Sequence, residues 1–252
     1  MNSTITGALV FACLFGAGLL GVRVRAALPE DHLSSDTKDA VKVGMGLVAT
    51  MAALVLGLLV ASTKGAYDTQ KNEVTQLAAK TVFLDRVLAN YGSESAESRD
   101  LLRGSVGSAI DRMWPDKKSS QAAQLDPSVS SGEVFFNSIQ KLSPQDDVHR
   151  SLKSQAAQIA TDIGQMRWLL FEQTETSISV TMLIILISWL AIIFMSAGLF
   201  APANATVIIA LMLAALSVAG AIFLILELDT PFDGVIQISK KPMYNALVHL
   251  GH

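Results

Sequence analysis

The chain has 252 residues, of which 51% are hydrophobic and 16% are charged, and its mean hydropathy is +0.43. A soluble domain carries about a quarter charged residues, so this composition favours a membrane protein. The net charge is −3, and acidic and basic residues alternate along the polar part of the chain, which argues against a nucleic-acid-binding surface.

Three stretches contain no charged residue: 1–22, 43–63 and 177–226. Because about 20 apolar residues cross a bilayer, each of the first two predicts one transmembrane helix. A Gly/Pro/Asn turn signal at 198–204 interrupts the longer third stretch, which therefore predicts two. We expect an all-α membrane protein with transmembrane helices at about 5–22, 43–63, 178–198 and 205–226.

The first stretch has the length of a signal peptide. However, no basic residue precedes it, and Arg23 and Arg25 follow it directly. These flanks favour a retained transmembrane helix. Cys13, the single cysteine, lies inside it and forms no intrachain disulfide.

The polar segment 64–174 has the periodicity of helices. An apolar stripe continues from the second transmembrane stretch as far as Tyr91, and Gly92 is expected to end that helix. A shorter helix is expected over about 96–113, before Pro115.

Two further helix starts are marked by capping signals. Ser130 and Glu133 have the spacing of a capping box. Ser143 is expected to be an N-cap residue, with Pro144 and Asp146 in the first turn. From there the apolar periodicity predicts a helix that runs without a break into the third transmembrane helix.

These elements divide the chain into four parts: a transmembrane hairpin at 1–64, a helical domain at 65–175, a second transmembrane hairpin at 176–228, and a C-terminal tail at 229–252. Four crossings place both termini and the helical domain on the same side of the membrane. Lysines and arginines near the helix ends do not decide which side is the cytoplasm.

The sequence offers little support for an enzyme. Its four histidines are scattered, no phosphate-binding loop follows a strand, and we expect no catalytic residue, metal ion or cofactor. The transmembrane stretches carry no ionisable residue between their ends, which argues against a proton-driven transporter. A pore or an assembly protein remains.

Small residues follow one face of the second transmembrane helix: Gly46, Thr50, Ala53, Gly57 and Ala61. Such a column lets helix backbones approach closely, which is one interpretation. In the other interpretation the face lines a central path in an oligomer, where small side chains leave the path wide.

Acidic residues gather near the ends of the third and fourth transmembrane helices: Glu172, Glu175, Glu227 and Asp229. Repeated around a symmetry axis, they would form an acidic mouth, which favours cations. Ordinary interfacial charge is the alternative interpretation.

Three segments resemble a bacterial family of bestrophin-like membrane proteins and, more distantly, the bestrophin anion channels. They are residues 28–68, which end in "GLLVASTKGAYD", then "LDRVLANYG" (84–92) and "LDTPFDGVIQISKKPMYNAL" (228–247). This resemblance implies a pentamer in the bacterial inner membrane, with cytosolic termini and a helical cytosolic domain between the second and third transmembrane helices.

In bestrophins the second transmembrane helix lines the neck of the pore with bulky apolar residues. Counted back from the shared "AYD", those positions are Ala53, Gly57 and Ala61 here, so the resemblance implies that the small-residue column faces the pore. The calcium-binding acidic cluster of animal bestrophins is reduced to Asp229 and Asp233, so calcium activation is not expected.

The sequence therefore predicts a homo-oligomeric channel in a lipid bilayer that conducts inorganic ions passively and prefers anions. A cation-conducting pore with the acidic mouth is one alternative. A non-conducting structural or regulatory membrane oligomer is the other.

Overall fold

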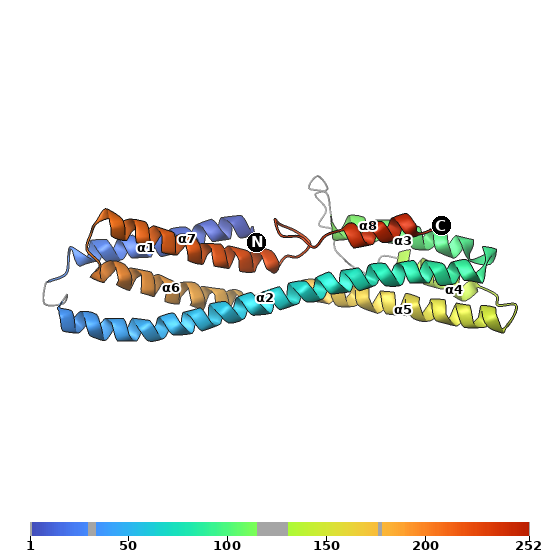
Figure 1. Ribbon diagram of the computed structural model, residues 1–252, viewed down its shortest axis with the longest axis horizontal. Coiled ribbons are helices and arrows are strands. Elements are labelled where there is room, and N and C mark those ends of the chain that lie inside the picture. The colour runs from blue at the N-terminus through green and yellow to red at the C-terminus, as the bar shows by residue number, and fades with distance from the viewer. Residues whose placement is uncertain (1, 30–33, 115–130, 176–177, 252) are drawn as a thin grey trace. The chain divides into compact units, whose positions relative to one another are not determined.

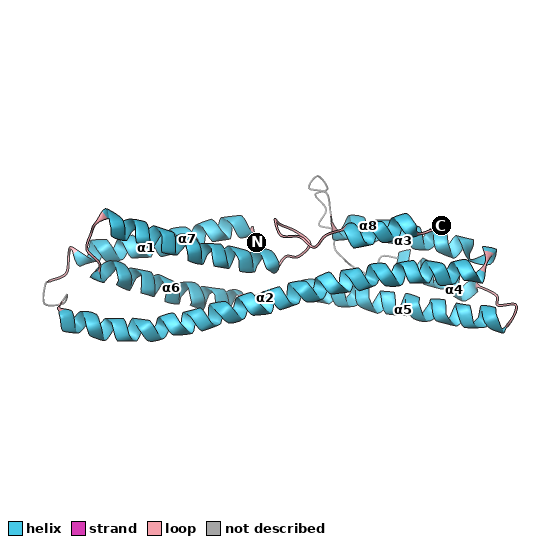
Figure 2. Cartoon of the chain, in the orientation of Figure 1, coloured by secondary structure: helices cyan, strands magenta, loops and turns pink. Residues whose placement is uncertain are grey.

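The computed structural model describes residues 2–29, 34–114, 131–175 and 178–251. This part of the chain consists of helices joined by loops and turns, and it contains no strand (Figure 1, Figure 2). Four helices are long and apolar enough to cross a membrane: α1 (Ser3–Arg25), α2 (Ser35–Tyr91), α6 (Val180–Phe200) and α7 (Ala205–Leu228). The others are α3 (Ala96–Met113), α4 (Ser131–Lys141), α5 (Asp147–Glu175) and α8 (Lys241–His249). The expected all-α class and the four candidate transmembrane helices are confirmed.

The chain divides into two compact units. The first contains Met1–Ala66 and Ser177–Thr230, and the second contains Tyr67–Thr176 and Pro231–His252. The 57-residue helix α2 contributes its N-terminal part to the first unit and its C-terminal part to the second. Of the C-terminal tail, Pro231–His252 belongs to the second unit.

The first unit packs α1 against α6 and α7, with part of α2 beside them (Figure 1). Its core consists of fully buried aliphatic side chains, among them Val10, Leu14, Leu186, Ile222 and Ile225. Since lipid tails are as apolar as these side chains, close packing rather than the hydrophobic effect holds such helices together.

Glycines bring α1 and α6 into backbone contact. A Cβ atom added to Gly198 would lie 2.1 Å from the carbonyl oxygen of Gly18. No side chain fits at such a contact, so glycine is required at this crossing.

The prediction of an unbroken helix into the third transmembrane helix is wrong. Helix α5 ends at Glu175, and Ile178 and Ser179 are not helical before α6 begins at Val180. The backbone N–H of Ile178 donates to the Asp229 carboxylate, with a distance of 3.3 Å. Serine, threonine and β-branched residues fill this junction, and all are weak helix formers.

The second unit buries a core between α2, α3, α4, α5 and α8. Its fully buried side chains include Leu84, Leu88, Ile139, Met243 and Leu250. The last two come from α8 and the residue after it, so the C-terminal tail completes this core.

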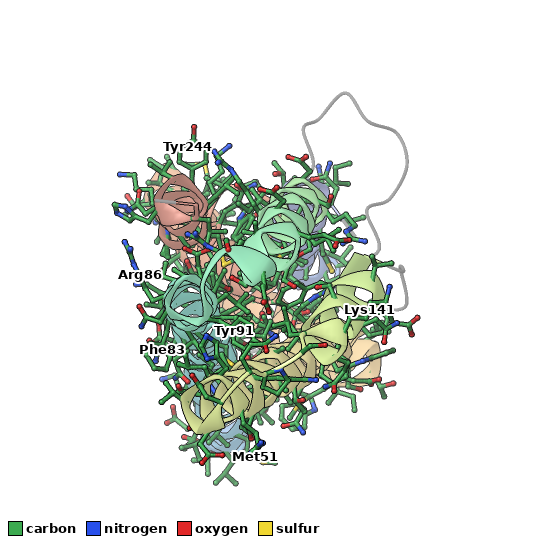
Figure 3. All side chains as sticks on the ribbon, turned by 90° about the vertical axis from the view of Figure 1, so that its right-hand side faces the viewer. Met51, Phe83, Arg86, Tyr91, Lys141 and Tyr244 are labelled. Carbon is green, nitrogen blue, oxygen red and sulfur yellow. The ribbon has the colours of Figure 1, made fainter. Side chains whose placement is uncertain are left out.

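Figure 3 shows how side chains of the second unit divide between core and surface. Tyr91 lies among the helices and is 3% exposed, whereas Lys141 and Tyr244 project outward. The tail is also tied down by Trp114, whose indole N–H donates to the carbonyl of Ile238 at 2.8 Å.

Two helix boundaries can be compared with the sequence predictions: the end of α2 and the start of α5. Helix α2 ends at Tyr91, and Gly92 follows with φ +106°, as its position predicts. The expected N-cap Ser143 is wrong. The carboxylate of Asp146 accepts the backbone N–H of His149 at 2.8 Å, so Asp146 is the N-cap of α5. Ser130 lies outside the described residues.

A partly buried ion pair joins α2 to α3. Asp85 is 1% exposed, and its two oxygens accept from Nε and Nη2 of Arg99 at 2.8 and 2.9 Å. This bidentate hydrogen bonding raises the pKa of Arg99 above its usual value. The N–H of Gly251 also donates to Asp85, at 3.4 Å, which links the chain end to the same pair.

Candidate functional site

The candidate site lies on the N-terminal part of α2, within the charge-free stretch 43–63. Helix α2 has an 18-residue apolar window with a mean hydropathy of 2.4, and it continues without a break into a polar helix. Because an α-helix has 3.6 residues per turn, residues spaced by three and four positions share a face. We call Gly46, Thr50, Ala53, Gly57 and Ala61 the small-residue face.

All five residues of the small-residue face are exposed. Among the described residues, no atom of another element lies within 4 Å of a Cβ atom added to Gly46 or Gly57. Within the described part of one chain, therefore, this face packs against no other helix.

A different face of α2 holds the helix in its unit. Ala52, Leu59 and Thr63 are buried, and the first two belong to the core shared with α1, α6 and α7. The Thr63 hydroxyl donates to the Leu59 carbonyl at 2.6 Å, so its polar group is satisfied within the helix. The small-residue face points away from this packed face.

A third stripe carries large apolar side chains that are also exposed. It includes Leu47, Met51, Leu54 and Leu58, which are 52–68% exposed. Each of the four candidate transmembrane helices has an apolar stretch of 18 residues. In α2 only 11% of this stretch is buried, against 28% in each of the other three helices. Helix α2 thus presents two distinct open surfaces, one of small and one of large side chains.

Thr50 is the polar member of the small-residue face. Its hydroxyl donates to the Gly46 carbonyl at 2.9 Å, which uses the hydroxyl hydrogen and leaves the oxygen lone pairs open. At this level the face offers a hydrogen-bond acceptor between apolar positions.

The acidic residues predicted to form a mouth fall in both units. In the first unit, Glu227 is 2% exposed and Asp229 is half-buried, and both residues have interaction partners. Asp229 accepts the N–H of Ile178 and so helps to define the start of α6. This contact gives Asp229 a structural role, and an acidic ring stays a prediction.

The other two acids belong to the second unit. Glu172 is exposed on α5, and Glu175 is the last residue of that helix, with a side chain outside the described part. Asp233, which with Asp229 corresponds to the reduced calcium-binding cluster, accepts the N–H of Gly234 at 2.8 Å in a turn.

Sequence reasoning did not single out two sets of residues that the structure brings together. One is the glycine contact between α1 and α6. The other is Arg112 and Arg167, which line adjoining cavities of the second unit. Arg167 lies seven residues after Ala160 and four after Ile163, so it interrupts the apolar stripe of α5. A charged residue within an apolar stripe was the sequence signal that could have identified Arg167.

The fold and the four apolar helices define a helical, multi-pass membrane protein. A family model described as "Bestrophin-like domain" matches residues 12–243. The chain belongs to the bestrophin-like family, which confirms the resemblance seen in the sequence. Comparisons with curated proteins and with solved structures found no match.

Proposed function

We propose that the protein is an oligomeric channel that conducts inorganic ions passively, without catalysis, and that the small-residue face of α2 lines the ion path. The observation that carries this proposal is that the face contacts no other helix among the described residues, although it lies in the most apolar part of a long helix. Membership of the bestrophin-like family supports the same function.

The two open surfaces of α2 suit an assembly around an axis. Small side chains turned towards the axis would leave a wide path, and the stripe of Leu47, Met51, Leu54 and Leu58 would contact lipid or a neighbouring copy. We propose a homo-oligomer, and a pentamer on the precedent of bestrophins. A cyclic assembly of identical chains is the symmetry that such a path requires.

The proposed orientation follows the same precedent. The protein would lie in the bacterial inner membrane, with both termini and the unit that contains Tyr67–Thr176 in the cytoplasm. A polar unit with alternating charges suits an aqueous compartment on either side of a membrane.

The proposed anion selectivity is based on membership of the bestrophin-like family. Thr50 gives a reason to keep cations as the second candidate, because its hydroxyl offers an acceptor rather than a donor. The small-residue face contains no bulky side chain, so a gate that closes by dewetting is not expected at Gly57 or Ala61.

The reversal potential of the purified oligomer in a planar bilayer under a KCl gradient tests both the activity and its sign. A reversal near the chloride equilibrium potential supports the proposal. A reversal near the potassium equilibrium potential replaces it with the cation-conducting alternative. The absence of current from intact oligomers contradicts channel activity and leaves the small-residue face as an assembly surface.

A matched pair of variants tests the place of the path. Gly57→Trp adds bulk where nothing lies within 4 Å, and we expect it to abolish flux from liposomes. Leu58→Trp alters the adjacent large-residue stripe, where the side chain is 67% exposed, and it should leave flux within about twofold of wild type. Equal flux from both variants in correctly assembled oligomers would place the path elsewhere.

A further inference from the structure

A cavity of about 640 Å³ lies within the second unit, between α2, α3, α4 and α5. This volume falls in the range of small-molecule sites, which is about 300–1,000 Å³. Its walls are mostly aliphatic and aromatic, with Leu77, Leu102, Val106, Phe135, Phe136 and Trp168 as the large apolar contributors. A ligand in this cavity would therefore meet mainly apolar surface.

Arg167 brings a positive charge to this apolar cavity. Its guanidinium lies against the first turn of α4, where a Cβ atom added to Gly132 would be 3.0 Å from Nη1. The described residues provide no hydrogen bond or ion pair to this guanidinium. Glu133 also lines the cavity but forms no ion pair with Arg167.

Arg112 stands next to Arg167. Both line a small hollow of about 30 Å³ that shares Leu77 and Ala109 with the large cavity. Nε of Arg112 donates to the Ser108 carbonyl at 3.2 Å, whereas Nη2 is buried and has no hydrogen-bond partner among the described residues.

The two arginines destabilise each other. Burial, and then the charge of Arg112, lower the pKa of Arg167 below its usual value. Unpaired guanidinium groups in an apolar setting are unfavourable unless an anion compensates them. A carboxylate accepts two parallel hydrogen bonds from a guanidinium, so it would satisfy both the charge and the open N–H groups.

We propose that this cavity binds a small monocarboxylate carried on an apolar or aromatic body. The carboxylate lies between Arg112 and Arg167, and the body contacts the Phe135–Phe136 side of the cavity. The exposed Glu133 disfavours a ligand with a second negative charge. This binding site lies within the second unit and is independent of the ion path proposed for α2.

Calorimetric titration of the full-length protein with phenylbutyrate tests the proposal. Phenylbutyramide, which has the same body and no charge, is the matched ligand. We expect the carboxylate to bind at least about tenfold more tightly than the amide, because hydrogen bonds to charged groups are the stronger ones. Arg167→Gln and Arg112→Gln should each lower the affinity for phenylbutyrate by about tenfold.

Two further variants separate a binding defect from a folding defect. Arg150→Gln removes an exposed arginine of the same helix and should leave the affinity unchanged. Gly164 lines the cavity, and nothing lies within 4 Å of a Cβ atom added there. Gly164→Leu keeps both arginines and fills part of the cavity, so it should abolish binding while the protein remains folded.

Each remaining outcome overturns the proposal. Wild-type protein that binds neither ligand has no such site. Equal affinity for carboxylate and amide, or unchanged affinity in Arg167→Gln, removes the role of the arginines. Acetate that binds as tightly as phenylbutyrate removes the role of the apolar walls.

Discussion

Gly21 of α1 and Met195 of α6 are in direct backbone contact. A Cβ atom added to Gly21 would lie 2.1 Å from the Met195 carbonyl oxygen, a separation that no real side chain adopts. Together with Gly18 and Gly198, this contact sets how closely the two helices approach.

Gly21→Ala should therefore destabilise the first unit by about 1–3 kcal/mol, because the two backbones must separate to admit the methyl group. The melting temperature of the purified protein in detergent measures the effect. Gly16→Ala is the matched control, since nothing lies within 4 Å of its Cβ position on the same helix. Similar melting temperatures for the two variants would contradict the contact.

Asp85→Asn should destabilise the second unit by about 3 kcal/mol, because it removes the buried carboxylate of a partly buried ion pair and weakens the hydrogen bond from Gly251. Thermal unfolding measures this loss. Asp147→Asn is the control, since Asp147 and its partner Arg150 are largely exposed, and it should cost less than about 1 kcal/mol. An Asp85→Asn variant as stable as this control would show that the pair contributes nothing.

The sequence pattern and the structure assign different N-cap residues to α5, and two variants distinguish them. Asp146→Ala removes the side chain that caps the N–H of His149, and it should lower the melting temperature. Ser143→Ala should leave it unchanged, although the sequence pattern predicts Ser143 as the cap. The opposite ranking would mean that the helix begins three residues earlier than the structure has it.

Asp162 predicts a pH dependence. Its carboxylate accepts from Lys80 at 2.6 Å and from Gln158 at 3.2 Å, and these hydrogen bonds lower the pKa of Asp162 below its usual value. When folding lowers the pKa of a carboxyl group, the ionised group stabilises the folded state. This stabilisation is fully present above the unfolded-state pKa of about 3.9, and it is lost as the pH falls through the lower folded-state pKa.

Wild type should therefore be more stable than Asp162→Asn at pH about 7, and the difference should vanish at about pH 2. Thermal unfolding at the two pH values provides the comparison. Lys80→Gln should reproduce the loss at neutral pH. A difference that is the same at both pH values would contradict the linkage.

The parts of the fold that the sequence predicts are those that depend on local pattern. Stretches without charge predict the four apolar helices, and Gly92 predicts the end of α2 because only glycine readily adopts its positive φ. The break between α5 and α6 could not be predicted from the local sequence. Its apolar periodicity favours a continuous helix, whereas the side chain of Asp229, 51 residues away, binds the N–H of Ile178.

The candidate site follows the same division. The spacing of Gly46 to Ala61 places these residues on one face, but only the packing of α1, α6 and α7 decides that this face is the open one. Likewise, "GAGLLG" contains three glycines, and the rotation of α1 decides that Gly21 touches α6 whereas Gly16 touches nothing. Such rotations depend on tertiary contacts that a single sequence does not specify.

The most direct test of the proposed ion path is thiol modification at Ala53. In a Cys13→Ser background, which removes the single native cysteine, Ala53→Cys should react with a charged, water-soluble methanethiosulfonate, and the reaction should block ion flux. Leu54→Cys, on the adjacent and equally exposed large-residue stripe, should react far more slowly, because in the proposed assembly that stripe would face lipid or a neighbouring copy. If the Ala53→Cys variant is as unreactive as the Leu54→Cys variant, or reacts without any change in flux, the small-residue face does not line a water-filled path.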